Sequence, residues 1–161
     1  MEDMMKFLLN VALLFSALIY IVPAQAMDDS LAFSGSTSVN AIYDVRTGDE
    51  KKLQFIFKVI RDTFDETKQQ KVEPHYVLTM RGPTVSLLAS DRQGDAELKK
   101  KTRTLIDELN KRGVRMEACG YALNLFALNE EDLFGGIHAV GNSLNSLIGY
   151  QAQGYALVPM N

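Results

Sequence analysis

Cys119 is the only cysteine in the 161-residue chain, and it closes an apolar stretch, residues 114–119, that reads VRMEAC. Gly120 follows, and the next residues have helical character. The pattern therefore predicts a cysteine at the carboxyl end of a strand, just before a helix. The unpaired N–H groups and positive dipole end of a helix favour thiolate, the nucleophilic form of cysteine. Free cysteines are also among the most buried residue types, so an inert structural thiol is the alternative interpretation.

A single thiol restricts the chemistry. It excludes an internal disulfide, a multi-cysteine zinc or iron–sulfur site within one chain, and thioredoxin-type exchange through Cys-x-x-Cys. The chain has only two histidines, so we expect neither a protein-ligated transition metal nor a cofactor. A cysteine–histidine dyad would need His75, which begins a strand at the opposite edge from Cys119, or His138. His138 could approach from a later strand, where a lone histidine is more often structural. A lone thiol can still accept sulfur as a persulfide and pass it on.

The first 26 residues have the pattern of a secretory signal peptide. Lys6 precedes an apolar run, residues 7–22, and Ala24-Gln25-Ala26 forms an A-x-A cleavage site. The run is short for a membrane span, and an uncleaved anchor is the alternative. We expect cleavage after Ala26, a flexible N-terminal arm over residues 27–39, and one domain over residues 40–161. The mature protein would be periplasmic or secreted, with no membrane attachment.

The composition is that of a globular domain, with 47% hydrophobic and 23% charged residues. The net charge of −3 makes a nucleic-acid partner a poor expectation. Lys99-Lys100-Lys101 is a local basic cluster, but acidic residues flank it, so we interpret it as a solvated helix face.

Strand-like and helix-like segments alternate from residue 41 onward. The strand segments are residues 41–45, 75–80, 114–119, 136–140 and 155–159, and the helical segments between them are residues 47–70, 84–89, 95–112, 121–128 and 142–151. Such alternation predicts an α/β fold with a mainly parallel five-stranded sheet and helices on both faces.

The first long helix carries two signals. Thr47 and Glu50 have the S/T-x-x-E spacing of a capping box, which would start the helix. An apolar stripe follows at helical spacing, and Phe55 and Val59 widen it. This width predicts a helix that is buried on two sides or that contacts another copy of the chain. The stripe consists of Leu53, Ile56, Phe57, Ile60 and Phe64.

The carboxyl ends of the predicted strands gather chemically useful residues, and ligands of parallel sheets bind at these ends. Asp44 and Arg46, Arg81, Cys119 and the turn at residues 139–141 lie there. No Gly-x-Gly-x-x-Gly or Walker pattern follows any strand, so nucleotide binding has no support.

The sequence from residue 40 to 161 resembles the DsrE/DsrF-like family, the YchN-like fold of sulfur-relay proteins. The resemblance rests on the first strand and long helix and on three stretches, VRMEACGYALN, EEDLFGGIHAV and SLIGYQAQGYALVPM. The last stretch looks most like the exported single-domain members. The resemblance implies a three-layer α/β/α fold with a parallel five-stranded core, and assembly into homo-oligomers.

The resemblance also implies that Cys119 occupies the place of the persulfide-carrying cysteine. In the relay proteins the helix after that cysteine leads to an Arg-Gly pair, whereas here it leads to Leu128-Asn129. Two functions therefore stay open. One is a sulfurtransferase or sulfur carrier that exchanges sulfur with a donor or acceptor protein, with Arg81, Asn124 and His138 as candidate pocket residues. The other is a non-catalytic oligomeric binding module.

Overall fold

The computed structural model describes residues 29–161, and the predicted signal peptide lies outside them. Five strands alternate with helices along this part of the chain. In chain order the elements are β1 (Ser38–Val45), α2 (Glu50–Gln69), β2 (Glu73–Met80), the 3₁₀ helix η1 (Gly82–Leu88), α3 (Ala96–Lys111), β3 (Arg115–Cys119), α4 (Gly120–Leu125), the 3₁₀ helix η2 (Glu130–Asp132), β4 (Ile137–Val140), α5 (Ser143–Ala152) and β5 (Ala156–Met160).

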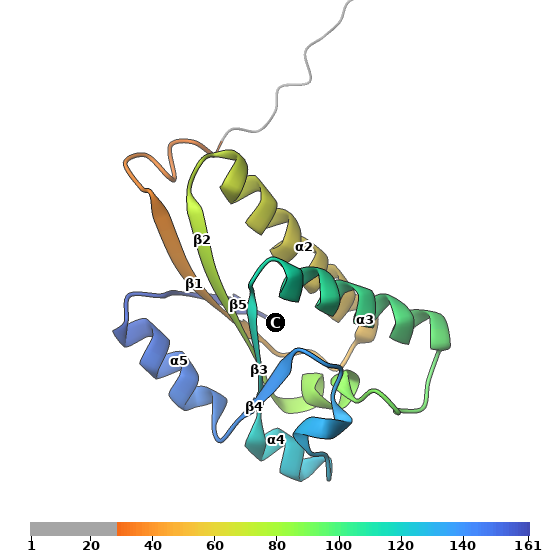
Figure 1. Ribbon diagram of the computed structural model, residues 1–161. Helices are drawn as coiled ribbons and strands as arrows, with labels where there is room; N and C mark the ends of the chain where they lie inside the picture. The colour runs from red at the N-terminus through yellow and green to blue at the C-terminus, as the bar shows by residue number, and fades with distance from the viewer. Residues whose placement is uncertain (1–28) are drawn as a thin grey trace, which may run out of the picture. The chain divides into compact units, whose positions relative to one another are not determined.

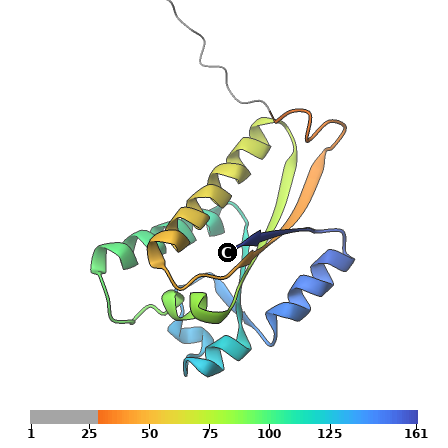
Figure 2. The ribbon, with the colours of Figure 1, turned by 180° about the vertical axis from the view of Figure 1, so that it is seen from behind.

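The five strands form one sheet in the order β4-β3-β2-β1-β5, and every neighbouring pair is parallel. Helices α2 and α3 cover one face of the sheet and α5 covers the other (Figures 1 and 2). The predicted α/β class and three-layer arrangement are therefore confirmed. The shared direction of the strands places all their carboxyl ends at one edge of the sheet, where β3 delivers Cys119.

The start of α2 differs from the predicted capping box. The N-cap is Asp49, whose carboxylate accepts a hydrogen bond from the Lys52 N–H at 2.9 Å. Thr47 is occupied elsewhere, because its hydroxyl accepts from the Asp49 N–H and its own N–H donates to the Thr84 hydroxyl at 2.7 Å. Aspartate is as good an N-cap as threonine. The sequence therefore could not show whether Thr47 or Asp49 caps the helix.

The main hydrophobic core lies between the sheet and the α2–α3 layer. All five residues of the predicted α2 stripe are buried in it. Phe55 does not join them and is 66% exposed. Val59 is half-buried. The second apolar side of α2 is thus only partly covered within one chain, and the oligomer contact predicted for it stays a prediction.

Two strands begin earlier than the sequence indicated. β1 starts at Ser38 inside the predicted arm, and β2 starts at Glu73 and includes Pro74. Pro74 pairs with Val39, while β3 joins β2 only from Val77 onward. The sheet is narrow at this point, and proline is tolerated near the start of a strand.

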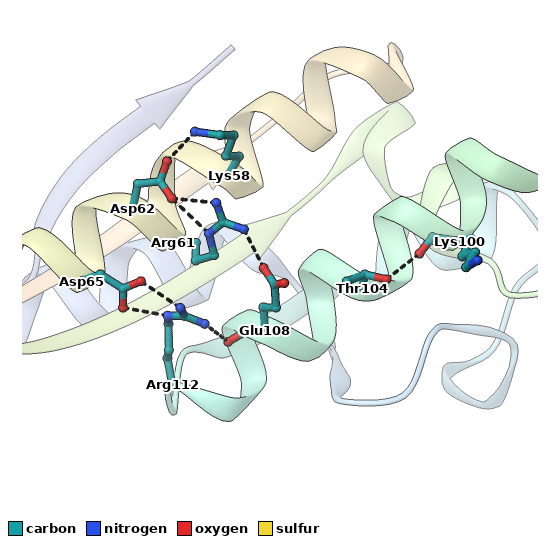
Figure 3. Close-up of polar contacts among 8 residues, drawn as sticks. All are labelled: Lys58, Arg61, Asp62, Asp65, Lys100, Thr104, Glu108 and Arg112. Atoms are coloured by element: carbon teal, nitrogen blue, oxygen red, sulfur yellow. Dashed lines mark hydrogen bonds and ion pairs between the residues drawn. The ribbon is translucent and has the colours of Figure 1, made fainter.

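Helices α2 and α3 are also linked by charged side chains on their outer surface (Figure 3). Arg61 donates to Glu108 across the two helices at 2.7 Å and to Asp62 on its own helix. Arg112 bridges back from the end of α3 to both carboxylate oxygens of Asp65, at 2.8 Å each. These contacts link the two helices on their outer surface, whereas the core contacts hold both helices against the sheet.

The opposite face is packed more lightly. Its buried apolar cluster consists of Ile42, Val77 and Leu147, with Tyr150 and Tyr155 against it. A carboxylate is buried on this side as well. Glu117 is 2% exposed and accepts hydrogen bonds at Oε1 from Arg115 and Tyr150, whereas its buried Oε2 has no hydrogen-bond partner in the described structure.

Candidate functional site

Cys119 ends β3 and is the N-cap residue of α4. Gly120 brings this turn against the loop between β4 and α5. A Cβ atom at position 120 would lie 2.8 Å from the carbonyl oxygen of Val140 and 3.0 Å from that of Gly141. Only glycine permits such a close backbone approach. The contact therefore sets the thiol beside the first turn of α5.

Ser143, the first residue of α5, is fully buried at this point. Its hydroxyl approaches the Cys119 sulfur but completes no hydrogen bond of good geometry within the described structure. Burial raises the pKa of the thiol. The hydroxyl and backbone N–H of Ser143 and the N–H groups of Ala122 and Tyr121 outweigh burial, and the pKa of Cys119 lies below its ordinary value. The site thus favours the thiolate.

Arg81 follows β2 directly and is fixed by Asp44, near the carboxyl end of β1. Its Nε donates to Oδ1 of Asp44 at 2.8 Å and its Nη2 to Oδ2 at 2.7 Å. These hydrogen bonds raise the pKa of Arg81, burial lowers it, and the charges of Asp44 and of the Cys119 thiolate raise it further. The guanidinium is therefore a permanent positive charge within electrostatic range of the sulfur.

A cavity of about 390 Å³ opens over the thiol at the carboxyl edge of the sheet. Cys119 itself is only 6% exposed, so the cavity is its route to solvent. Arg81 is the charged residue of the lining. The other lining residues are Gly82, Tyr121, Ala122, Leu125, Asn142, Ser143 and Leu144. The arrangement is that of a thiol of lowered pKa at the base of a mostly apolar cavity with one cation in its wall.

Comparison with family models shows which family the sequence belongs to. The model of the DsrE/DsrF-like family matches residues 40–160. This chain belongs to that family. No curated protein matches the sequence.

Two solved structures share the family fold. The protein of unknown function MTH1491 from Methanobacterium thermoautotrophicum has a TM-score of 0.63 at 17% identity, over 75% of this chain and 98% of that one. The YchN protein from E. coli has a TM-score of 0.55 at 11% identity, over 77% of this chain and 98% of that one. At these identities the likeness supports the fold alone.

The DsrE/DsrF-like fold brings together two of the four candidate residues from the sequence. Arg81 and Cys119 line the same cavity. Asn124 is exposed on α4 and lines a neighbouring hollow with Asn129 and Glu130. His138 is exposed on β4, with its Nδ1 3.8 Å from Glu130, and it is absent from the cavity lining.

Sequence reasoning missed Asn142 and Ser143. The β4–α5 turn was recognised as a strand end, but nothing in the sequence showed that it would pack against the turn after β3. Gly120 is the one available signal, because a glycine next to a candidate nucleophile often marks a close backbone contact.

The described residues contain no group of three or more His, Cys, Asp or Glu side chains placed to hold a metal ion. Within residues 29–161, no helix is long and apolar enough to cross a membrane.

Proposed function

We propose that this DsrE/DsrF-like protein is an exported sulfur carrier or sulfurtransferase that holds sulfur as a persulfide on Cys119. The observation that carries the proposal is the setting of the thiol. It lies at the carboxyl edge of a parallel sheet, with its pKa lowered by Ser143, Ala122 and Tyr121, at the base of a cavity. Family membership agrees with a sulfur-relay role.

The chemistry needs only one cysteine. The thiolate attacks the outer sulfur of a persulfide donor R–S–SH, a new S–S bond forms, and R–S⁻ leaves, which gives Cys119–S–SH. The chain has no second thiol to resolve this product. The outer sulfur must therefore pass to a thiolate on another molecule, which fits a carrier better than an oxidoreductase.

The predicted signal peptide supports an exported protein, so the donor and acceptor would meet it in the periplasm or outside the cell. Export is tested by fractionating cells that express the whole chain and measuring the mass of the recovered protein. Loss of residues 1–26 is expected. Recovery of the uncleaved chain in the membrane fraction would support the anchor instead.

Persulfide formation is tested by intact mass. Protein recovered after expression of the whole chain is incubated with inorganic polysulfide and measured beside Cys119→Ser. We expect an adduct of about 32 Da, one sulfur atom, on the wild type only, removed by dithiothreitol. A folded wild-type protein without this adduct would contradict the proposal.

A second candidate function is an oligomeric interaction module, and the surface around the cavity favours it. Leu125 is 75% exposed, Tyr121 71%, Ile148 65% and Leu144 49%. Apolar side chains gathered in this way mark contact surfaces. Sedimentation of the wild type and of Leu125→Ser separates the two roles. The module requires an oligomer that the substitution disrupts, whereas a carrier loads sulfur in either state.

A further inference from the structure

The cavity over Cys119 restricts what can deliver sulfur. The cysteine is 6% exposed and lies at the base of a space of about 390 Å³. A small molecule fits such a space. A cysteine on the surface of a folded partner would have to reach past the side chains of Tyr121 and Leu125 at its wall. The burial of the thiol therefore favours a small donor.

The wall of the cavity also offers an unused cationic donor. Arg81 binds Asp44 through Nε and Nη2, which leaves Nη1 without a hydrogen bond to any described residue. The Arg81 side chain is 25% exposed, and no carboxylate lines the cavity. The Arg46 side chain lies beside Gly82, which lines the cavity, since a Cβ at Gly82 would lie 3.7 Å from its Cγ. Arg46 has no ion pair within the described residues.

Ser143 provides a second sign of a ligand. Its side chain is fully buried, it lines the cavity, and its hydroxyl is without a hydrogen-bond partner. A buried hydroxyl without a partner is costly. It can donate to the Cys119 thiolate when that forms, or to an anion that occupies the cavity beside it.

We propose that the donor is a small oxyanion of sulfur of the thiosulfate class, bound by Arg81 through its sulfonate oxygens. The inference rests on the proposed persulfide function and names its substrate. Cys119–S⁻ attacks the sulfane sulfur of S–SO₃²⁻ and forms a new S–S bond. The S–S bond of thiosulfate breaks, and its electron pair leaves with sulfite. The products are Cys119–S–S⁻ and SO₃²⁻, so atoms and charge balance without any further reagent.

Charge makes a cation necessary for this step. A thiolate and a dianion repel each other, and the repulsion grows in a space with mostly apolar walls. Arg81 offsets part of it at the sulfonate end, since Asp44 already balances part of the guanidinium charge. Its planar guanidinium suits an oxyanion, since it can present two N–H groups at once. An uncharged persulfide donor would not need this residue.

The experiment compares two sulfur donors on three proteins. Wild type, Arg81→Gln and Arg112→Gln are each incubated with polysulfide or with thiosulfate, and the mass of the protein and the sulfite released are measured. Arg112 is the matched control because it is also bound at two atoms to one carboxylate, Asp65, and neither residue lines the cavity.

Polysulfide is also an anion but has no sulfonate oxygens for Arg81 to bind, so we expect it to load all three proteins, with a smaller loss of rate at Arg81→Gln than thiosulfate shows. Thiosulfate should load wild type and Arg112→Gln, with one sulfite released per sulfur bound, and should load Arg81→Gln at least tenfold more slowly. If polysulfide loads the wild type and thiosulfate does not, the donor assignment is wrong and the carrier function stands. Loading by a persulfidated protein alone would overturn the assignment in the same way. If no donor loads the protein, the carrier function fails too.

A second measurement avoids any variant that fails to fold. The wild type is alkylated with iodoacetate, an anion, and with neutral iodoacetamide, and the ratio of the two rates is compared with that of glutathione at the same pH. An anion-binding cavity raises the ratio at Cys119 severalfold, and added sulfate lowers it. A ratio equal to or below that of glutathione would contradict the proposal.

Discussion

The two faces of the sheet differ in the size of the apolar cluster that covers them. On the α2–α3 side, one large apolar cluster is closed by two long helices, and charged side chains such as Arg61 and Glu108 link their outer surface. On the α5 side, three buried apolar residues lie under a single ten-residue helix. The first face therefore supplies most of the stability of the chain, and the second has room for other groups.

The α5 face carries polar and charged side chains where the other face carries apolar ones. The strand register places Asp44 beside Thr79, Thr79 beside Glu117 and Glu117 beside His138, which makes a polar row across four strands. Asp44 holds the arginine at the cavity, and Cys119 lies two residues beyond Glu117 on the same face. Natural proteins depart from ordinary packing most often where they function. Here the light apolar packing and the row of polar residues lie on the same face of the sheet.

Two leucine truncations test the contrast directly and should have the largest effects. Leu53 is fully buried in the main core, whereas Leu147 is 7% exposed in the small cluster. Leu→Ala substitutions cost 2–5 kcal/mol depending on the cavity left behind, so we expect about 4 kcal/mol for Leu53→Ala and about 2 kcal/mol for Leu147→Ala. Urea unfolding measures both. Equal losses would mean that the two faces contribute alike.

Ser143→Ala should move stability and reactivity in opposite directions. At a pH below the folded pKa of Cys119, where the thiol is protonated, the hydroxyl has no hydrogen-bond partner, so its loss should leave the free energy of unfolding unchanged or raise it by up to ~1 kcal/mol. The hydroxyl also lowers the pKa of Cys119, so alkylation by iodoacetamide at neutral pH should slow severalfold. Ser146→Ala, one turn along α5, is the control. A variant that is less stable and equally reactive would assign Ser143 a purely structural role.

The lowered pKa of Cys119 beside Ser143 predicts that the free energy of unfolding depends on pH. The folded pKa of Cys119 lies below its unfolded value of about 8.5. The thiolate therefore adds stability that is complete above the unfolded pKa and is lost as the pH falls through the folded pKa. Ser143→Ala should reduce this dependence, which urea unfolding over a pH series would reveal.

The smallest effect is expected on the outer surface of the α2–α3 layer. Glu108→Gln removes the charge that Arg61 binds, while Arg112 keeps its hydrogen bond to the Glu108 carbonyl (Figure 3). Partly exposed ion pairs contribute little, so the free energy of unfolding should fall by about 0.5 kcal/mol, and less in high salt. A loss as large as that for Leu147→Ala would show that charged contacts, rather than the core, distinguish the two faces.

Much of the fold could be predicted because it depends on local patterns. The period of Leu53, Ile56 and Phe57 defined α2, and Gly113, with its φ of +81°, ended α3 at the expected place. Element boundaries were less certain wherever two residues suit one position, as Thr47 and Asp49 do at the start of α2.

The site was only half predictable, for a physical reason. Cys119 and Arg81 could be found because each lies at the carboxyl end of a strand, and parallel strands end together. Ser143 could not, because its place beside the thiol depends on a contact between two turns that are more than 20 residues apart. Glu117 was equally hidden, since its alternation with Met116 and Ala118 is that of an ordinary outward-facing residue, yet it is buried.

The two hydrogen bonds from Arg81 to Asp44 also affect the entropy of ligand binding. A free arginine side chain has about 2 kcal/mol of rotamer entropy to lose when it is immobilised. Here the two hydrogen bonds to Asp44 already fix the guanidinium in the folded chain. An incoming anion would meet a donor that is ordered before it arrives, so it would bind with a smaller entropic loss than a mobile surface arginine allows.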